Sequence, residues 1–223
     1  MTPRELFKNT ITCKNYHERA PRQLGWLGWM LTHHKADLEK ILTDFPIDND
    51  CPQTIYRERS KVSKSNLVNG IGTSVDSWGC KWTMLQAGYT GEIKDPIVTD
   101  DDWEDIPQIT IPEENLSFDI DQVNASCALK QDKYLIAPEC ISFFERLQYI
   151  RGTENLYMDL VDPPTGLLDF MDVLHDYNCR VYEKWAQPRS CSPAGRFVES
   201  IISCIVANVS HPPLFVNASY KFI

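Results

Sequence analysis

The sequence lacks any long uninterrupted hydrophobic run. Its most apolar stretch, residues 197–209, is too short and too often interrupted by polar residues to cross a bilayer. The opening segment, MTPRELFKNTITCKN, alternates charged and single apolar residues and has no continuous apolar core of the kind a signal peptide needs. We therefore predict a cytoplasmic protein.

Positive charge is also in short supply. The 22 Lys and Arg residues are outnumbered by 31 Asp and Glu residues, which gives a net charge of −9. Nucleic acids and anionic membranes are bound by clustered Lys and Arg side chains. We therefore expect neither a nucleic acid nor a membrane as a partner.

Paired cysteine motifs are absent. The 8 cysteines are scattered along the chain with no C-x-x-C spacing. A cytoplasmic protein keeps its thiols reduced. We therefore predict free thiols and no disulfide framework.

What the sequence does contain is a dense group of aromatic and polar residues within residues 71–92. A short apolar run ends at Val75 and is followed by Asp76, Trp78, Cys80 and Trp82. An acid at the end of a strand, flanked by large aromatics, is typical of a binding cleft at the carboxyl edge of a parallel sheet. The alternative is a buried turn in which Asp76 caps backbone N–H groups and both Trp side chains belong to the core.

Several segments have clear periodic patterns. Thr2 and Pro3 are typical of a capped helix start, and residues 21–29 and 134–137 suit buried strands, the first ending at the mouth of a cleft near Trp26 and Trp29. A long helix is predicted after Asp162. Its apolar stripe, which we expect to face the core, consists of Leu167, Phe170, Leu174, Tyr177, Val181 and Trp185.

Two groups of potential metal ligands have simpler explanations. His33 and His34 are adjacent on a predicted helix, so their side chains point about 100° apart and cannot both face one metal ion. The acidic residues 100–105 also lie on different faces. Asp at the amino end of a helix is explained by capping and by the helix dipole, so we expect a capped helical turn here.

Three segments together resemble the uroporphyrinogen decarboxylase family, which also contains the corrinoid-linked methyltransferases. They are VDSWGCKW, GYTGEIKDPIVTDDDWEDI and FERLQYIRGTENLYMDLVDPPTGLLDFMDVLHDYN, and the resemblance extends over residues 2–185. It implies an α/β fold of the TIM (β/α)₈ barrel type, incomplete here, with about four or five βα units. Residues 1–186 would form the partial barrel domain, and residues 187–223 an atypical tail produced by truncation or frameshift.

The resemblance also implies an activity. In the decarboxylases the segment matching residues 21–29 carries arginines that hold the acetate and propionate groups of the substrate, whereas here Arg22 is the only cation nearby. This favours the methyltransferase-like branch, in which a methyl group passes between a corrinoid carrier and a small acceptor. The alternatives are uroporphyrinogen decarboxylation and a non-enzymatic remnant that binds a tetrapyrrole or a protein.

The candidate site residues come from the aromatic segment 71–92 and from the family resemblance. In the family, the strand ending near Glu139 and the next helix line the pocket, and a Tyr on that helix, here Tyr149, reaches the substrate. Asp76 would stabilise protonated pyrrole nitrogens in a decarboxylase. We expect Asp76 and Tyr149 as catalytic residues. The substrate-binding candidates are Trp26, Trp29, Trp78, Trp82 and Glu139.

No cofactor or metal is expected in this chain. The zinc ligands of the methyltransferase branch, a His-x-Cys pair and a distant Cys, have no counterpart in a matching context. The expected partners are a small molecule, a tetrapyrrole or corrinoid, and a corrinoid-carrying protein. An unfinished barrel would also leave an open edge through which copies of the chain associate.

Overall fold

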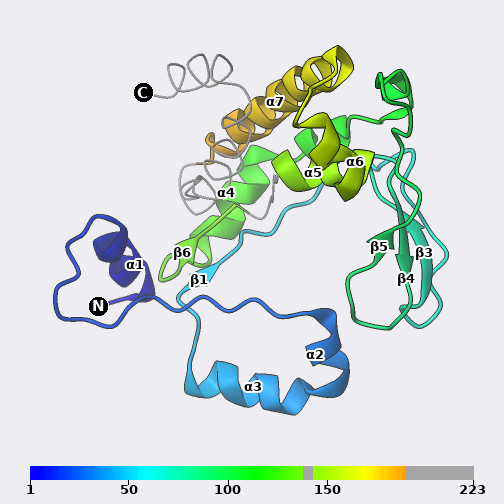
Figure 1. The fold of residues 1–223 in the computed structure, drawn as a ribbon. Helices are drawn as coiled ribbons and strands as arrows, with labels where there is room; N and C mark the ends of the chain where they lie inside the picture. Colours follow the sequence, from blue (N-terminus) through cyan, green and yellow to red (C-terminus); the bar gives the residue numbers. More distant parts are fainter. Residues whose placement is uncertain (138–142, 189–223) are drawn as a thin grey trace.

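The computed structural model describes residues 1–137 and 143–188, which form a mixed α/β fold with two small sheets (Figure 1). A two-stranded parallel sheet joins β1 (Asn49–Asp50) to β6 (Tyr134–Leu135). A second sheet is antiparallel, with its four strands in chain order. These strands are β2 (Lys64–Ser65), β3 (Gly72–Val75), β4 (Lys81–Met84) and β5 (Glu92–Ile93).

The predicted α/β class is confirmed, but the described residues do not form the predicted part of a TIM-type barrel. Within residues 1–137 and 143–188, parallel pairing is confined to β1 and β6, and no closed barrel forms. The strand ending at Val75 exists as β3, but it pairs antiparallel with β4, with Val75 opposite Lys81. A hairpin needs only a short turn, whereas neighbouring parallel strands need a long crossover. The local turn therefore decides the pairing of β3.

Residues 21–29 do not form the predicted first barrel strand. The segment runs without a sheet partner as far as α2 (Gly28–His33), and α3 (Lys35–Asp44) follows directly. The side chains of Leu24, Trp26 and Leu27 are exposed. A barrel strand would bury such side chains on both faces, so this segment has neither the partner nor the packing of one.

The predicted start of the first helix is confirmed. Helix α1 (Pro3–Ile11) begins with a capping box, in which the Glu5 amide donates to the Thr2 hydroxyl at 3.2 Å and the Thr2 amide donates to the Glu5 carboxylate at 2.8 Å. The ring of Phe7 stacks on Tyr134 with centroids 4.5 Å apart. This contact fastens α1 to β6 and to the parallel sheet.

The apolar stripe predicted for the long helix is also confirmed. All six of its residues are buried on α7 (Thr165–Trp185), although the cap position is Pro164 and Asp162 lies outside the helix. No helix within the described ranges is long and apolar enough to cross a membrane. The other helices are α4 (Ile120–Ala128), α5 (Phe143–Arg151), α6 (Thr153–Asp159) and the 3-10 helices η1 (Ile106–Gln108) and η2 (Glu113–Leu116).

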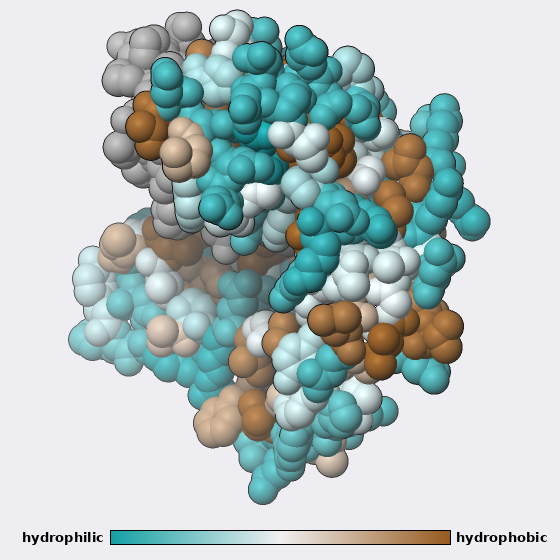
Figure 2. All heavy atoms as spheres, turned by 45° about the vertical axis from the view of Figure 1, so that its right-hand side comes forward, coloured by the Kyte–Doolittle hydropathy of each residue, from teal (hydrophilic) through white to brown (hydrophobic). Residues whose placement is uncertain are grey.

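Hydrophobic side chains also reach the surface. In Figure 2, patches of hydrophobic residues interrupt the hydrophilic surface on the side of the molecule that carries the antiparallel sheet. The turns of this sheet contribute Leu67, Val68, Ile71 and Leu85, all of which are exposed. The larger part of the apolar core lies elsewhere, between α5, α6, α7 and the loops that pack on them.

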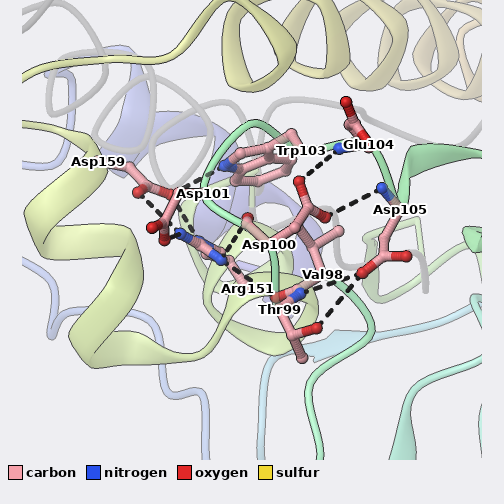
Figure 3. Close-up of polar contacts among 9 residues, drawn as sticks. All are labelled: Val98, Thr99, Asp100, Asp101, Trp103, Glu104, Asp105, Arg151 and Asp159. Atoms are coloured by element: carbon pink, nitrogen blue, oxygen red, sulfur yellow. Dashed lines mark hydrogen bonds and ion pairs between the residues drawn. The ribbon is translucent and has the colours of Figure 1, made fainter.

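A buried arginine ties α5 and α6 to the loop that precedes η1 (Figure 3). Arg151, only 2% exposed, donates from Nε and Nη2 to the two carboxylate oxygens of Asp159 at 2.7 and 3.1 Å. It also donates from Nη1 to the carbonyl of Asp100 at 2.8 Å. The indole of Trp103 donates to the same Asp159 carboxylate at 2.9 Å. The buried charge is thus paired and hydrogen-bonded on several sides, as burial requires.

The predicted capping role in the acidic segment is confirmed. The carboxylate of Asp100 accepts hydrogen bonds from the backbone amides of Glu104 at 2.6 Å and Asp105 at 3.1 Å, as Figure 3 shows. The turn leads into the short 3-10 helix η1 rather than into an α-helix. Within the described residues, no group of three or more His, Cys, Asp or Glu side chains is arranged to hold a metal ion.

The buried pair predicts a large stability effect. Asp159→Ala leaves the Arg151 guanidinium buried without its carboxylate, so we expect the free energy of unfolding to fall by about 3 to 5 kcal/mol. The matched control is Glu113→Ala, which breaks an ion pair to Arg180 whose side chains are 55% and 39% exposed. That change is expected to cost no more than about 1 kcal/mol. Urea unfolding of both variants measures the difference, and equal losses would contradict the account of the core.

Candidate functional site

The candidate site begins at the turn between β3 and β4. Asp76 follows β3, and its backbone amide donates to the carbonyl of Cys80 at 3.0 Å. The amide of Gly79 donates back to the Asp76 carbonyl at 3.1 Å, and Gly79 has a φ of 92°, a conformation that favours glycine. The turn is therefore tight and leaves the Asp76 side chain at the start of β4.

The carboxylate of Asp76 is held by four donors. One oxygen accepts the backbone amides of Trp78 and Cys80 at 3.0 and 2.9 Å. The other accepts the indole N–H of Trp82 at 3.1 Å and Nη1 of Arg146 at 3.0 Å. Because Arg146 belongs to α5, this last contact fastens the hairpin to the helix.

Aromatic rings surround the guanidinium of Arg146. Its central carbon lies 4.8 Å from the ring centroid of Trp78 and 5.3 Å from that of Tyr149. Both distances fit cation–π contacts. The rings of Trp82 and Tyr149 meet at 4.8 Å with an interplanar angle of 69°. We call Asp76, Trp78, Trp82, Arg146 and Tyr149 the Asp76 cluster.

The structure brings together four of the predicted site residues. Asp76, Trp78 and Trp82 come from the hairpin, and Tyr149 comes from α5. Of the two interpretations of the 71–92 segment, the turn accounts for the Asp76 hydrogen bonds and for the burial of Trp78. Trp82 and Tyr149 are only partly buried, so they keep surface that a ligand can contact.

The other predicted residues do not join this cluster. The Trp29 amide donates to the carbonyl of Gly88 at 2.8 Å. Gly88 lies beyond the end of β4, whereas Asp76 lies before its start, so Trp29 and the nearby Trp26 are at the opposite end of the hairpin. Glu139 lies outside the described residues.

Sequence reasoning missed Arg146, which pairs with the predicted acid. A usable signal was present, because Arg146 precedes Tyr149 by three residues on a predicted helix and therefore shares its face. An acid at a strand end also needs a counter-charge when it is partly buried. The side chains of Asp76 and Arg146 are 24% and 21% exposed, so the pair is shielded from water without being cut off from it.

Cys80 lies against the cluster but is not a nucleophile. Its side chain is fully buried, with Sγ 4.0 Å from Nη1 of Arg146. Burial, reinforced by the nearby Asp76 charge, raises the pKa of the Cys80 thiol to about 12. At neutral pH the thiol stays protonated and unreactive. Cys13, Cys80 and Cys127 are free thiols, as predicted.

The Asp76 carboxylate is arranged to hold other groups in place rather than to transfer a proton. A general acid or base must reach a reacting group within hydrogen-bond distance. Both oxygens of Asp76 already accept two hydrogen bonds each from the protein. The Trp82 and Tyr149 rings and the Arg146 guanidinium supply stacking surface and positive charge instead.

Comparison with known protein families, with curated proteins and with solved structures finds no match to this chain. The family resemblance drawn from the sequence therefore stays a prediction. The Asp76 cluster, with the ligands that its side chains are able to bind, is the feature of this chain that points to a function.

The environment of Cys80 predicts a clear difference in thiol reactivity. In the native protein at pH 8, iodoacetamide is expected to alkylate the exposed Cys13 and to leave Cys80 unmodified, because Cys80 is buried and its pKa is about 12. After unfolding in guanidinium chloride both should react. Mass spectrometry of the alkylated peptides measures this, and labelling of native Cys80 at the rate of Cys13 would show that the thiol is not packed under Arg146.

Proposed function

We propose that residues 2–185 belong to a methyl-transfer protein of the uroporphyrinogen decarboxylase type. In this proposal a methyl group passes between a corrinoid, carried by a partner protein, and a small acceptor bound at the Asp76 cluster. The observation that supports it is the meeting of Trp82 with Tyr149 at 4.8 Å. The resemblance assigns these two segments to one site although they lie far apart in the chain.

The charge of the cluster supports methyl transfer over decarboxylation. The single cation, Arg146, is already paired with Asp76. A porphyrinogen with several carboxylates needs several cations to hold it. Decarboxylation also requires Asp76 to face pyrrole nitrogens, whereas its oxygens are occupied by four protein donors.

Each side chain then has a limited task. Trp82 and Tyr149 present ring surface to a planar or apolar ligand. Arg146 supplies a fixed positive charge, and Asp76 positions Arg146 and Trp82 through its second carboxylate oxygen. The corrinoid itself supplies the methyl-transfer chemistry when the partner delivers it.

A second candidate function is non-enzymatic binding of a tetrapyrrole or a protein. The occupation of the Asp76 carboxylate favours it, because both oxygens of this side chain are already held by protein donors. Both candidates predict ligand binding at Trp82 and Tyr149, and they differ in turnover.

Titration of the whole 223-residue chain with hydroxocobalamin tests binding. We expect saturable quenching of tryptophan fluorescence and a shift in the visible corrinoid spectrum. Trp82→Leu should weaken both responses, because it removes one of the two partly exposed rings of the cluster. Trp26→Leu is the matched control, since Trp26 lies at the opposite end of the hairpin, and it should bind as the wild type does.

Turnover separates the two candidates. With methylcobalamin as donor and 2-mercaptoethanol as acceptor, methyl transfer is followed as the loss of the methylcobalamin spectrum. Binding with turnover that Tyr149→Leu reduces supports the transferase, because this change removes the ring that contacts Trp82. Binding without turnover supports the binding protein. A wild-type chain that gives no saturable response to hydroxocobalamin contradicts both.

A further inference from the structure

One edge of the Arg146 guanidinium has no acceptor among the residues that the structure describes. Nη1 donates to Asp76 and lies near Cys80. Within residues 1–137 and 143–188, Nε and Nη2 of Arg146 have no acceptor, and neither is a buried nitrogen without a partner. The Arg146 side chain is 21% exposed and lies beside the aromatic rings of the cluster.

Other arginines of this fold fill two nitrogens with a single carboxylate. Arg19 binds Asp48 at 2.6 and 2.8 Å, and Arg180 binds Glu113 at 2.7 and 2.7 Å. Those two arginines use Nη1 and Nη2, whereas Arg151 binds Asp159 through Nε and Nη2. The Nε–Nη2 edge of Arg146 offers the donor pair that Arg151 uses, without a carboxylate from the described residues.

The free edge is held in a fixed orientation. The guanidinium lies over Trp78 and Tyr149, and Asp76 pins its far side. Asp76 is itself fixed by two backbone amides. A ligand that binds here does not have to order a flexible arginine, which removes a cost that surface arginines impose on binding.

We propose that the Nε–Nη2 edge of Arg146 binds the carboxylate of a small organic ligand whose hydrocarbon part packs against Trp82 and Tyr149. A planar carboxylate matches the two parallel N–H groups of this edge. The neighbouring Asp76 carries a negative charge, so a ligand with one negative charge is favoured over the doubly charged phosphate. The site therefore selects small monocarboxylates with an apolar or aromatic body.

In the proposed function, the methyl acceptor would be a small carboxylate bound at Arg146. This role in methyl transfer rests on the proposed function. The binding itself rests only on the geometry of Arg146 and the rings. It is therefore tested without any corrinoid or methyl donor. A chain that binds a carboxylate but transfers no methyl group would overturn the proposed function and leave the binding site in place.

The test is a titration of the ¹⁵N-labelled full chain with sodium benzoate at constant ionic strength. Two-dimensional NMR follows the Nε–H signals of the arginines, and Arg146→Lys identifies the Arg146 signal by its loss. We expect a saturable shift of that signal with benzoate. Benzamide, which has the same shape and no charge, should give no such shift, and inorganic phosphate should bind about tenfold more weakly.

Tryptophan fluorescence supplies an independent readout. Arg146→Lys keeps a cation beside Asp76 but loses the two-donor edge, so its benzoate affinity should fall by about tenfold or more. Arg57→Lys is the matched control, because Arg57 is exposed and remote in its contacts, pairing with Asp119. A wild-type spectrum in which no arginine Nε–H signal shifts saturably with benzoate, or in which every such shift is equalled by benzamide, would overturn the proposal. This result needs no signal assignment, so it holds even if Arg146→Lys fails to fold.

Discussion

The carboxylate of Asp76 joins two parts of the fold that are otherwise separate in the chain. One oxygen closes the β3–β4 turn on itself through two backbone amides, and the other reaches across to α5 through Arg146. The candidate site forms because the Asp76 side chain makes both sets of contacts. Without Asp76, the Trp82 indole and the Arg146 guanidinium would lose the carboxylate that they share.

Helix α5 carries Arg146, the partner of Asp76, and also the buried Arg151. Arg146 faces the hairpin, and Arg151, at the end of the same helix, is buried against Asp159 and the loop before η1. The backbone of that loop is also tied to the helix, because the Val98 amide donates to the Ile150 carbonyl at 3.0 Å. The deep ion pair fixes the position of the helix, so the shallow pair at the Asp76 cluster is presented by a rigid element.

Local signals in the sequence predicted local structure well. The Thr2 capping box, the apolar stripe of α7 and the buried strand at Tyr134 depend on residues that are close in the chain. The barrel was wrong because the pattern of a short strand does not reveal whether its neighbour is parallel or antiparallel. The pairing of Asp76 with Arg146 was missed for a similar reason, since the partners are 70 residues apart. Asp76, Trp78, Trp82 and Tyr149 lie together, whereas the position of Trp26 and Trp29 depends on how α2 packs against Gly88.

A double-mutant cycle on Asp76 and Arg146 tests most directly whether this pair holds the hairpin to α5. The unfolding free energies of Asp76→Ala, Arg146→Ala and the double variant are compared with that of the wild type. Contact between the side chains predicts a coupling energy of about 1 to 3 kcal/mol. If the losses of unfolding free energy in the two single variants add up to that of the double variant within about 0.5 kcal/mol, the two residues act independently. The Asp76–Arg146 pair would then not hold the hairpin to α5.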